Sequence, residues 1–259
     1  MSGHKAVLDM PREKIREDYI ERLASFWPEP RDQLHFGGWR ATYELVEKLN
    51  LDTANHILDI CCGEGGTACW LAKEYGRRVA GIDILKSAIK VAKKCAKKNR
   101  VTDLTDFRVA DVFDLPFHEN EFDVIYGLDP DGIAHMDRLD IFRECKRVLK
   151  SGGKLGFQHW LVHKGTPQED IAYFETVTMG TGYPYMRRLT VDEYVMDLEN
   201  AGFRDIVVED LSEMYMAHTL KIKDKVAEMN KDLDVWHAML LELYDKGVRI
   251  GARIIAETD

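Results

Sequence analysis

The stretch HILDICCGEGGTACWLA, residues 56–72, limits the possible folds of this chain more than any other segment. It begins as a short apolar run, which is typical of a buried strand, and passes through Gly63, Gly65 and Gly66 into a helical pattern. Glycine lets the backbone turn sharply and approach a ligand closely, and the following helix presents free N–H groups at its first turn. The stretch therefore predicts a strand, a tight turn and a helix that hold an anionic or nucleotide-like ligand.

The same alternation continues along the middle of the chain. Helical patterns at about 65–75, 87–98 and 138–149 are interleaved with short apolar runs that predict strands at 56–61, 78–83, 106–110, 121–126 and 153–159. Strands that alternate with helices form a parallel sheet with helices on both faces. We therefore expect an α/β fold built on a mostly parallel sheet.

The flanking segments are predicted to be largely helical. Amphipathic patterns cover 11–26 and 39–49, and Thr190 with Glu193 forms a capping-box pattern for a helix at 191–201 that closes at Gly202. Residues 211–246 are expected to be helical, strands are expected at 203–210 and 247–258, and 161–190 show no clear period. This organisation predicts an N-terminal helical cap (1–55), a core (56–160) and a C-terminal part (161–259) that combines lid insertions with the end of the sheet.

Composition restricts the partners and the compartment. The 259 residues carry a net charge of −9 and show no broadly basic segment, which argues against a nucleic-acid partner because phosphate contacts dominate that affinity. The five cysteines lack the spacing of a disulfide framework, and neither a signal peptide nor a long apolar run is visible. We therefore expect a cytoplasmic protein, a monomer or homodimer, with no structural metal and no stable membrane association.

Three acidic residues indicate which ligand the glycine turn holds. Asp83 ends the predicted strand after the turn, where a carboxylate can hydrogen-bond both hydroxyls of a ribose. Asp59 lies four residues before the first glycine, at a place that suits an ammonium group better than a pyrophosphate, and Asp111 follows the third strand. The turn also satisfies a relaxed dinucleotide fingerprint, so a dinucleotide oxidoreductase stays a competing interpretation. In both cases the ligand is expected to carry a nucleoside.

These segments, in this order and spacing, resemble the class I (Rossmann-like) S-adenosylmethionine-dependent methyltransferases over residues 56–160. The resemblance rests on the glycine turn together with RVAGIDI, FRVADVFDLPF, EFDVIYGLD and RVLKSGGKLGF; Cys61 stands where the family usually has glycine. It implies a seven-stranded sheet and S-adenosyl-L-methionine as cofactor. The cofactor-binding residues that it implies are Gly37, Asp59, Cys61, Gly63, Gly65, Asp83, Ile84, Asp111, Val112 and Gly127.

Outside that core the chain resembles the sarcosine/dimethylglycine and phosphoethanolamine N-methyltransferases in part. Asp131 and His135, in DGIAH, keep the spacing of the Asp and His that follow the fourth strand in the phosphoethanolamine enzymes, where an N-terminal tyrosine pairs with the histidine. The resemblance implies that His135 removes the proton of an amine, oriented by Tyr19. The substrate-side candidates are Asp129, Trp160, Tyr183 and Tyr185.

The sequence leaves several of these roles open. His135 could instead cap the helix that begins near Asp137, Tyr19 and Trp160 could be packing residues, and His159 fits a core position or a ligand position equally. No arginine stands at the lid position that the phosphoethanolamine enzymes use, and Arg187 and Arg188 could substitute only if the loop shifted, which argues against a phosphorylated substrate. We expect a methyltransferase acting on the nitrogen of a small amine or amino acid. The alternatives are methylation of a thiol, hydroxyl or lipid carbon, or a cofactor-binding regulator that has lost the chemistry.

Overall fold

The computed structural model describes residues 35–130, 138–180, 190–229 and 231–259. Seven strands form a single sheet in the order β3-β2-β1-β4-β5-β7-β6. Their bounds are β1 (His56–Ile60), β2 (Arg78–Asp83), β3 (Thr105–Val109), β4 (Phe122–Leu128), β5 (Leu149–Val162), β6 (Arg204–Asp210) and β7 (Ile250–Glu257). The expected seven-stranded α/β sheet is confirmed.

The sheet is mostly parallel. The neighbouring strands from β3 to β5 all pair in parallel, whereas β7 runs antiparallel to both β5 and β6. Helical crossovers of the kind that the sequence predicts between these strands produce such parallel pairs. As a consequence, the carboxyl ends of β1, β2, β3, β4 and β5 meet at one edge, and ligands of open α/β sheets bind at such an edge.

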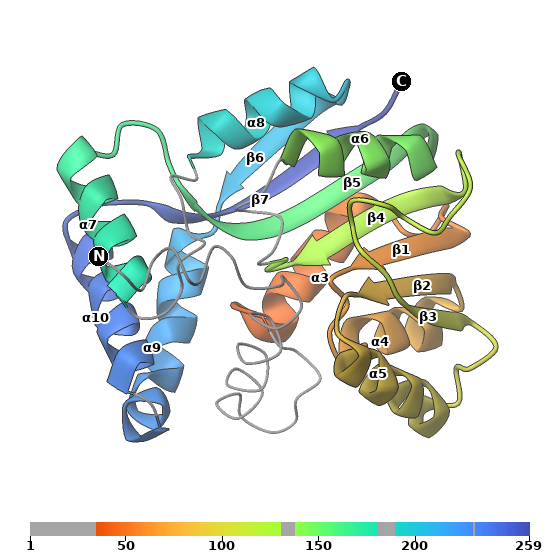
Figure 1. Ribbon diagram of the computed structural model, residues 1–259, viewed down its shortest axis with the longest axis horizontal. Helices are drawn as coiled ribbons and strands as arrows, with labels where there is room; N and C mark the ends of the chain where they lie inside the picture. Colours follow the sequence, from red (N-terminus) through yellow and green to blue (C-terminus); the bar gives the residue numbers. More distant parts are fainter. Residues whose placement is uncertain (1–34, 131–137, 181–189, 230) are drawn as a thin grey trace, which may run out of the picture.

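Helices cover both faces of the sheet (Figure 1). One face packs against α6 (Arg138–Val148) and α8 (Val191–Asn200), with Phe142 and Tyr194 fully buried in that core. The other face packs against α3 (Gly38–Leu49), α4 (Gly66–Tyr75) and α5 (Lys86–Asn99). Strands covered on both sides are apolar almost throughout, which explains the near-continuous burial of β1 and β2.

A third group of helices lies beyond the carboxyl edge (Figure 1). It consists of α7 (Gln168–Gly180), α9 (Ser212–Met229) and α10 (Lys231–Asp245). The sequence pattern did not predict α7, and it did not divide 211–246 into two helices. The helix α7 begins after Pro167 with Glu169 and Asp170 in its first turn, which are signals of a helix start, and buries Ile171 and Phe174 against the same core as α10.

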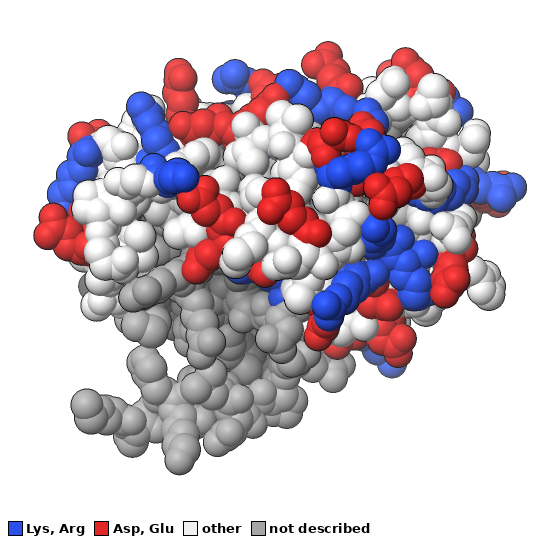
Figure 2. Space-filling model, turned by 90° about the horizontal axis from the view of Figure 1, so that it is seen from above, with Lys and Arg blue, Asp and Glu red and all other residues white. Residues whose placement is uncertain are grey.

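The surface over α6 and α8 carries charges of both signs. Figure 2 views the molecule from this side and shows acidic and basic side chains interspersed, with no large area of one sign. Among the described residues no helix is long and apolar enough to span a membrane.

Candidate functional site

The glycine turn connects β1 to α4 at the carboxyl edge of the sheet. Cys61, Gly63 and Gly65 all have positive φ, at 56°, 52° and 74°. A Cβ atom on Gly65 would lie 2.8 Å from both Ala92 Cβ and Phe107 Cζ, so only glycine fits there. Because Gly65 is also the N-cap of α4, no side chain of that residue covers the first N–H groups of the helix. The turn can therefore present these groups to an anionic part of a ligand.

Asp83, at the end of β2, lies directly beside the turn. Its Oδ2 accepts a hydrogen bond from the Gly63 N–H at 3.0 Å and its Oδ1 accepts one from the Leu85 N–H at 2.9 Å. These bonds hold the carboxylate against the turn. Since each carboxylate oxygen has two lone pairs, both oxygens can still accept from a ligand. This arrangement fits the two hydroxyls of a ribose.

Asp59 is a buried acid at the end of β1. It is in register with Tyr126 of β4, and the Tyr126 hydroxyl donates to Asp59 Oδ2 at 2.7 Å. Burial raises the pKa of Asp59 to about 8; the Tyr126 hydrogen bond opposes this shift and the charge of Asp83 adds to it. A ligand that brings a cationic nitrogen would favour the ionised form. Asp59 therefore fits an ammonium group, and the Tyr126 hydroxyl fixes the position of its carboxylate.

The remaining candidates for the cofactor line the same edge. Asp111 follows β3, and its Oδ1 accepts from the Phe113 N–H at 3.1 Å; Val112 is buried beside it. Ile84 follows Asp83 directly and is partly exposed. Gly127 lies in β4, where a Cβ atom would come within 2.9 Å of the Phe157 ring. The structure thus brings the predicted residues of four strands to one edge of the sheet.

Asp129, just after β4, connects this edge to two distant segments. Its Oδ2 accepts from the Phe36 N–H at 2.7 Å, and its Oδ1 accepts from the Tyr215 hydroxyl of α9 at 2.8 Å. Its own N–H donates to the Gln158 carbonyl, and its φ of 46° is positive. The sequence did not reveal Phe36 or Tyr215 as partners, because no local pattern relates residues so far apart in the chain.

Gly37, the last cofactor candidate, directly follows Phe36, whose N–H donates to Asp129. It caps α3 with a φ of 81°, and a Cβ atom there would lie 2.6 Å from Ala41 Cβ and 2.8 Å from Met214 Sδ. The loop before α3 therefore packs closely against α9, and glycine makes this approach possible.

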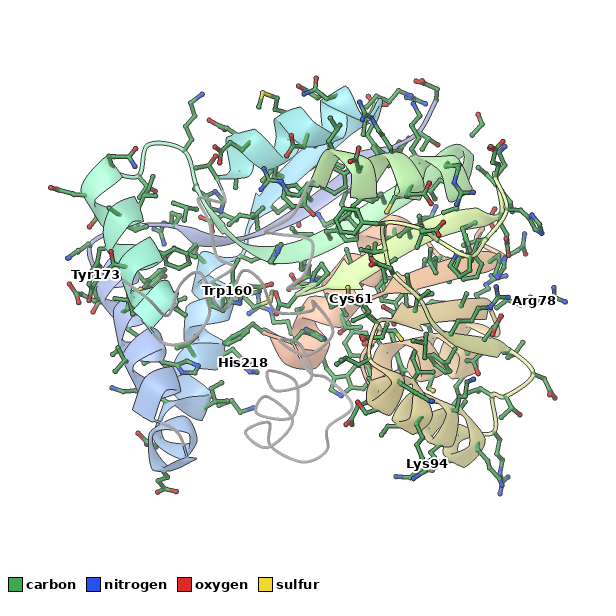
Figure 3. All side chains as sticks on the ribbon, in the orientation of Figure 1. Cys61, Arg78, Lys94, Trp160, Tyr173 and His218 are labelled. Carbon is green, nitrogen blue, oxygen red and sulfur yellow. The ribbon has the colours of Figure 1, made fainter. Side chains whose placement is uncertain are left out.

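Trp160 lies in a packed aromatic cluster between β5 and α9. Its ring is edge-on to Phe36, with centroids 4.5 Å apart, and lies 4.6 Å from Tyr215. Only 3% of Trp160 is exposed. Figure 3 shows Trp160 and His218 on the side of α9, away from Cys61. Of the two roles that the sequence left open for Trp160, its environment among the described residues corresponds to packing.

Other predicted residues lie outside the part of the chain that the structure describes. They are Tyr19, Asp131, His135, Tyr183 and Tyr185. The described part contains no group of three His, Cys, Asp or Glu side chains that could hold a metal ion.

Residues 58–157 match the family model described as "Methyltransferase domain". Phosphoethanolamine N-methyltransferase 1 of Zea mays is 34% identical over 197 residues, which are 76% of this chain but 37% of that protein. The chain thus spans little more than a third of the length of the maize protein.

A second relative is matched over most of its own length. Methyltransferase GfsG of Streptomyces halstedii is 30% identical over 209 residues, which are 79% of this chain and 74% of that protein. Among solved structures, a putative sarcosine dimethylglycine methyltransferase from Galdieria sulphuraria superposes with a TM-score of 0.76 at 17% identity, over 86% of this chain and 85% of the other. At that identity the likeness concerns the fold.

Proposed function

Since the chain belongs to the S-adenosylmethionine-dependent methyltransferases, we propose that it transfers the methyl group of S-adenosyl-L-methionine to the nitrogen of a small amine or amino acid. The observation that carries this proposal is the convergence of Asp59, Asp83 and the glycine turn at one sheet edge. Together they offer an anion, a pair of ribose acceptors and free helix N–H groups. S-Adenosylmethionine carries the complementary ammonium, ribose and carboxylate.

Each part of the cofactor has a partner in this proposal. Asp83 binds the ribose hydroxyls, Asp59 binds the ammonium, and the first turn of α4 binds the carboxylate. Asp111 accepts from the adenine amino group, with the backbone around Val112 beside it. The proposed cofactor-binding set is Gly37, Asp59, Cys61, Gly63, Gly65, Asp83, Ile84, Asp111, Val112 and Gly127.

The chemistry is an in-line displacement at the methyl carbon. The acceptor nitrogen attacks with its lone pair while the carbon–sulfur bond breaks, so the cofactor leaves as a neutral thioether. A protonated amine must first lose a proton, and we assign that step to His135, oriented by Tyr19 and assisted by Asp131. Asp129, Tyr183 and Tyr185 are the proposed residues of the acceptor side, whereas Trp160 belongs to the packed aromatic cluster.

The nature of the acceptor follows from the relatives and from the sequence. The name of the maize protein refers to N-methylation of a small amine, which supports nitrogen as the methylated atom. The lack of an arginine at the lid position that the phosphoethanolamine enzymes use argues against a phosphorylated amine. We therefore favour an unphosphorylated amine or amino acid over a thiol, a hydroxyl or a lipid carbon.

The proposal is tested by methyl transfer from isotope-labelled S-adenosylmethionine to a pooled set of amines, amino acids, thiols and phenols, read by mass spectrometry. A labelled amine or amino acid is the expected result. A labelled thiol or phenol would overturn the choice of nitrogen. No product together with tight binding of S-adenosylhomocysteine would favour a regulator.

The cofactor assignment has its own control. Replacing Asp83 by alanine should weaken S-adenosylhomocysteine binding by about 100-fold, because two hydrogen bonds to a charged group are lost. Asp106→Ala, at an exposed acid of β3 outside the site, should leave the affinity unchanged. Equal affinities of the Asp83→Ala variant and the unaltered protein in isothermal titration would contradict the assignment.

A further inference from the structure

His159 and Tyr194 form a buried pair on the face of the sheet that α6 and α8 cover. His159 lies in β5 and Tyr194 in α8, and their ring centroids are 6.5 Å apart with the ring planes nearly perpendicular. His159 is 1% exposed and Tyr194 is 0% exposed. In the structure as described, neither the His159 Nε2 nor the Tyr194 hydroxyl has a hydrogen-bond partner.

The proton of the His159 ring can be placed from its other nitrogen. The Trp160 N–H donates to His159 Nδ1 at 2.9 Å, so Nδ1 must carry a lone pair. Burial lowers the pKa of His159 to about 3, and the charge of Arg138 contributes, so the ring is neutral at physiological pH. A neutral imidazole with an unprotonated Nδ1 carries its proton on Nε2. His159 therefore offers a buried N–H donor.

The pair lies beside the edge where the proposed chemistry occurs. His159 is next to Gln158, whose carbonyl accepts from the Asp129 N–H at the end of β4. Thr190, which caps α8, forms a bridge with Val162 at the end of β5 and fixes the start of that helix.

The surroundings of the pair define what it could bind. The Arg138 guanidinium lies 5.8 Å from the centroid of the Tyr194 ring, but its charge is balanced by Asp197 at 2.7 Å. An N–H donor and a hydroxyl in a buried, apolar setting need an oxygen lone pair, and leaving them unsatisfied costs free energy. The acceptor nitrogen cannot fill this role, because it has no lone pair when protonated and must keep its lone pair for the methyl carbon when neutral. The complement of this pair is therefore an oxygen atom, not the amine itself.

From these observations we propose that His159 and Tyr194 bind the oxygen-bearing end of the methyl acceptor, which leaves its nitrogen for methylation. The inference rests on the proposed function and narrows it to acceptors with a carboxylate or hydroxyl a few bonds from the amine. A simple alkylamine would leave both donors unsatisfied and would bind more weakly.

Three secondary amines test the inference directly. Sarcosine carries a carboxylate, N-methylethanolamine carries a hydroxyl, and N-methylpropylamine has a methyl group in place of that hydroxyl. Protein with ¹⁵N-labelled histidine, saturated with S-adenosylhomocysteine, is titrated with each amine while the His159 Nε2–H signal, assigned through the His159→Gln variant, is followed by NMR. We expect sarcosine or N-methylethanolamine to shift the signal and N-methylpropylamine to leave it in place. A shift with sarcosine identifies the bound oxygen as that of a carboxylate, and a shift with N-methylethanolamine identifies it as that of a hydroxyl.

Tyr194→Phe removes only the hydroxyl and should weaken binding of the oxygen-bearing amines about tenfold, with unchanged affinity for S-adenosylhomocysteine. Tyr43→Phe, at an exposed tyrosine of α3, is the matched control. It should change neither the affinity for the amines nor the affinity for S-adenosylhomocysteine. The inference is overturned if none of the amines shifts the His159 signal or if all shift it equally. It is also overturned if Tyr194→Phe leaves the affinity for the amines unchanged, which is the result expected if the pair binds only a buried water. Failure of the proposed function would show separately in the methyl-transfer assay, as the absence of any labelled amine or amino acid.

Discussion

Cys61 holds a backbone conformation that side chains rarely adopt. Its φ of 56° lies in the left-handed region, where a Cβ atom costs about 1–2 kcal/mol, and the resemblance to other methyltransferases places a glycine at this position. The half-buried thiol packs against the core under α6 and α8, which offsets part of that cost. Cysteine is thus tolerated here through packing and not through backbone preference.

Substitutions at Cys61 should separate these two effects. Cys61→Gly relieves the backbone but loses the packing and makes the unfolded chain more flexible, so the free energy of unfolding should change by no more than about 1 kcal/mol. Cys61→Val places a β-branched side chain at positive φ and should lower it by about 1–3 kcal/mol. Urea unfolding measures both. A valine variant as stable as the glycine variant would contradict this account of the turn.

A hydrogen bond from the Tyr215 hydroxyl links α9 to the sheet edge. Tyr215→Phe removes the donor to Asp129 Oδ1 and leaves a partly buried carboxylate with one partner fewer, so stability should fall by about 1–3 kcal/mol. The loss should be local, with faster amide hydrogen exchange in α9 than in β1. Tyr43→Phe serves as the control, because its hydroxyl is on an exposed side chain. Unchanged exchange in α9 would show that the aromatic cluster alone holds this helix.

The capping box of α8 is an element that the sequence predicted correctly. The Thr190 hydroxyl oxygen accepts from the Glu193 N–H at 3.2 Å, and Glu193 accepts from the Thr190 N–H in return. Thr190→Ala should cost about 0.5–2 kcal/mol of unfolding free energy, whereas Thr190→Ser keeps the hydroxyl and should cost much less. Thermal unfolding compares the two variants. Equal losses would mean that the methyl group of threonine, and not the cap, stabilises this helix start.

The difference between α8 and α7 shows what local sequence can predict. The start of α8 is signalled by a capping box and its end by Gly202, whereas α7 lacks a clear apolar stripe and depends on packing of Ile171 and Phe174 against the core that it shares with α10. The order of the strands is likewise not local. The alternation of strands and helices predicts parallel pairing, but the insertion of β7 between β5 and β6 depends on tertiary contacts.

At the scale of the whole molecule, the site also combines residues that the local sequence pattern predicts with residues that only tertiary contacts bring together. Asp59, Asp83 and the glycines lie at strand ends and turns, so the strand pattern alone predicts that they share an edge. The contact between Asp129 and Tyr215 and the pair of His159 and Tyr194 join segments that only the fold brings together. No periodicity or spacing in the sequence encodes such contacts.

Buried titratable groups also make the stability of the whole molecule depend on pH. Burial lowers the pKa of His35, His159 and His218 from 6.5 to about 4, 3 and 4. Below pH 6.5 the unfolded chain binds protons that these folded imidazoles do not, so stability falls on acidification towards pH 4. Asp59 acts in the opposite direction, because its raised pKa of about 8 lets the folded protein keep a proton that the unfolded chain loses above 3.8.

These opposing shifts predict a maximum of stability near about pH 6.5 in the absence of cofactor. Between pH 4 and 6.5 the three histidines take up more protons on unfolding than Asp59 releases, so stability rises with pH. Between pH 6.5 and 8 only Asp59 among these groups changes its protonation on unfolding, so stability falls. Unfolding midpoints at pH 5, 6.5 and 8.5 and constant ionic strength measure both limbs. Asp59→Asn should abolish the fall above pH 6.5 and leave the acidic limb in place. A midpoint of the unaltered protein that is higher at pH 8.5 than at 6.5 would show that Asp59 is ionised in the folded chain before any ligand binds.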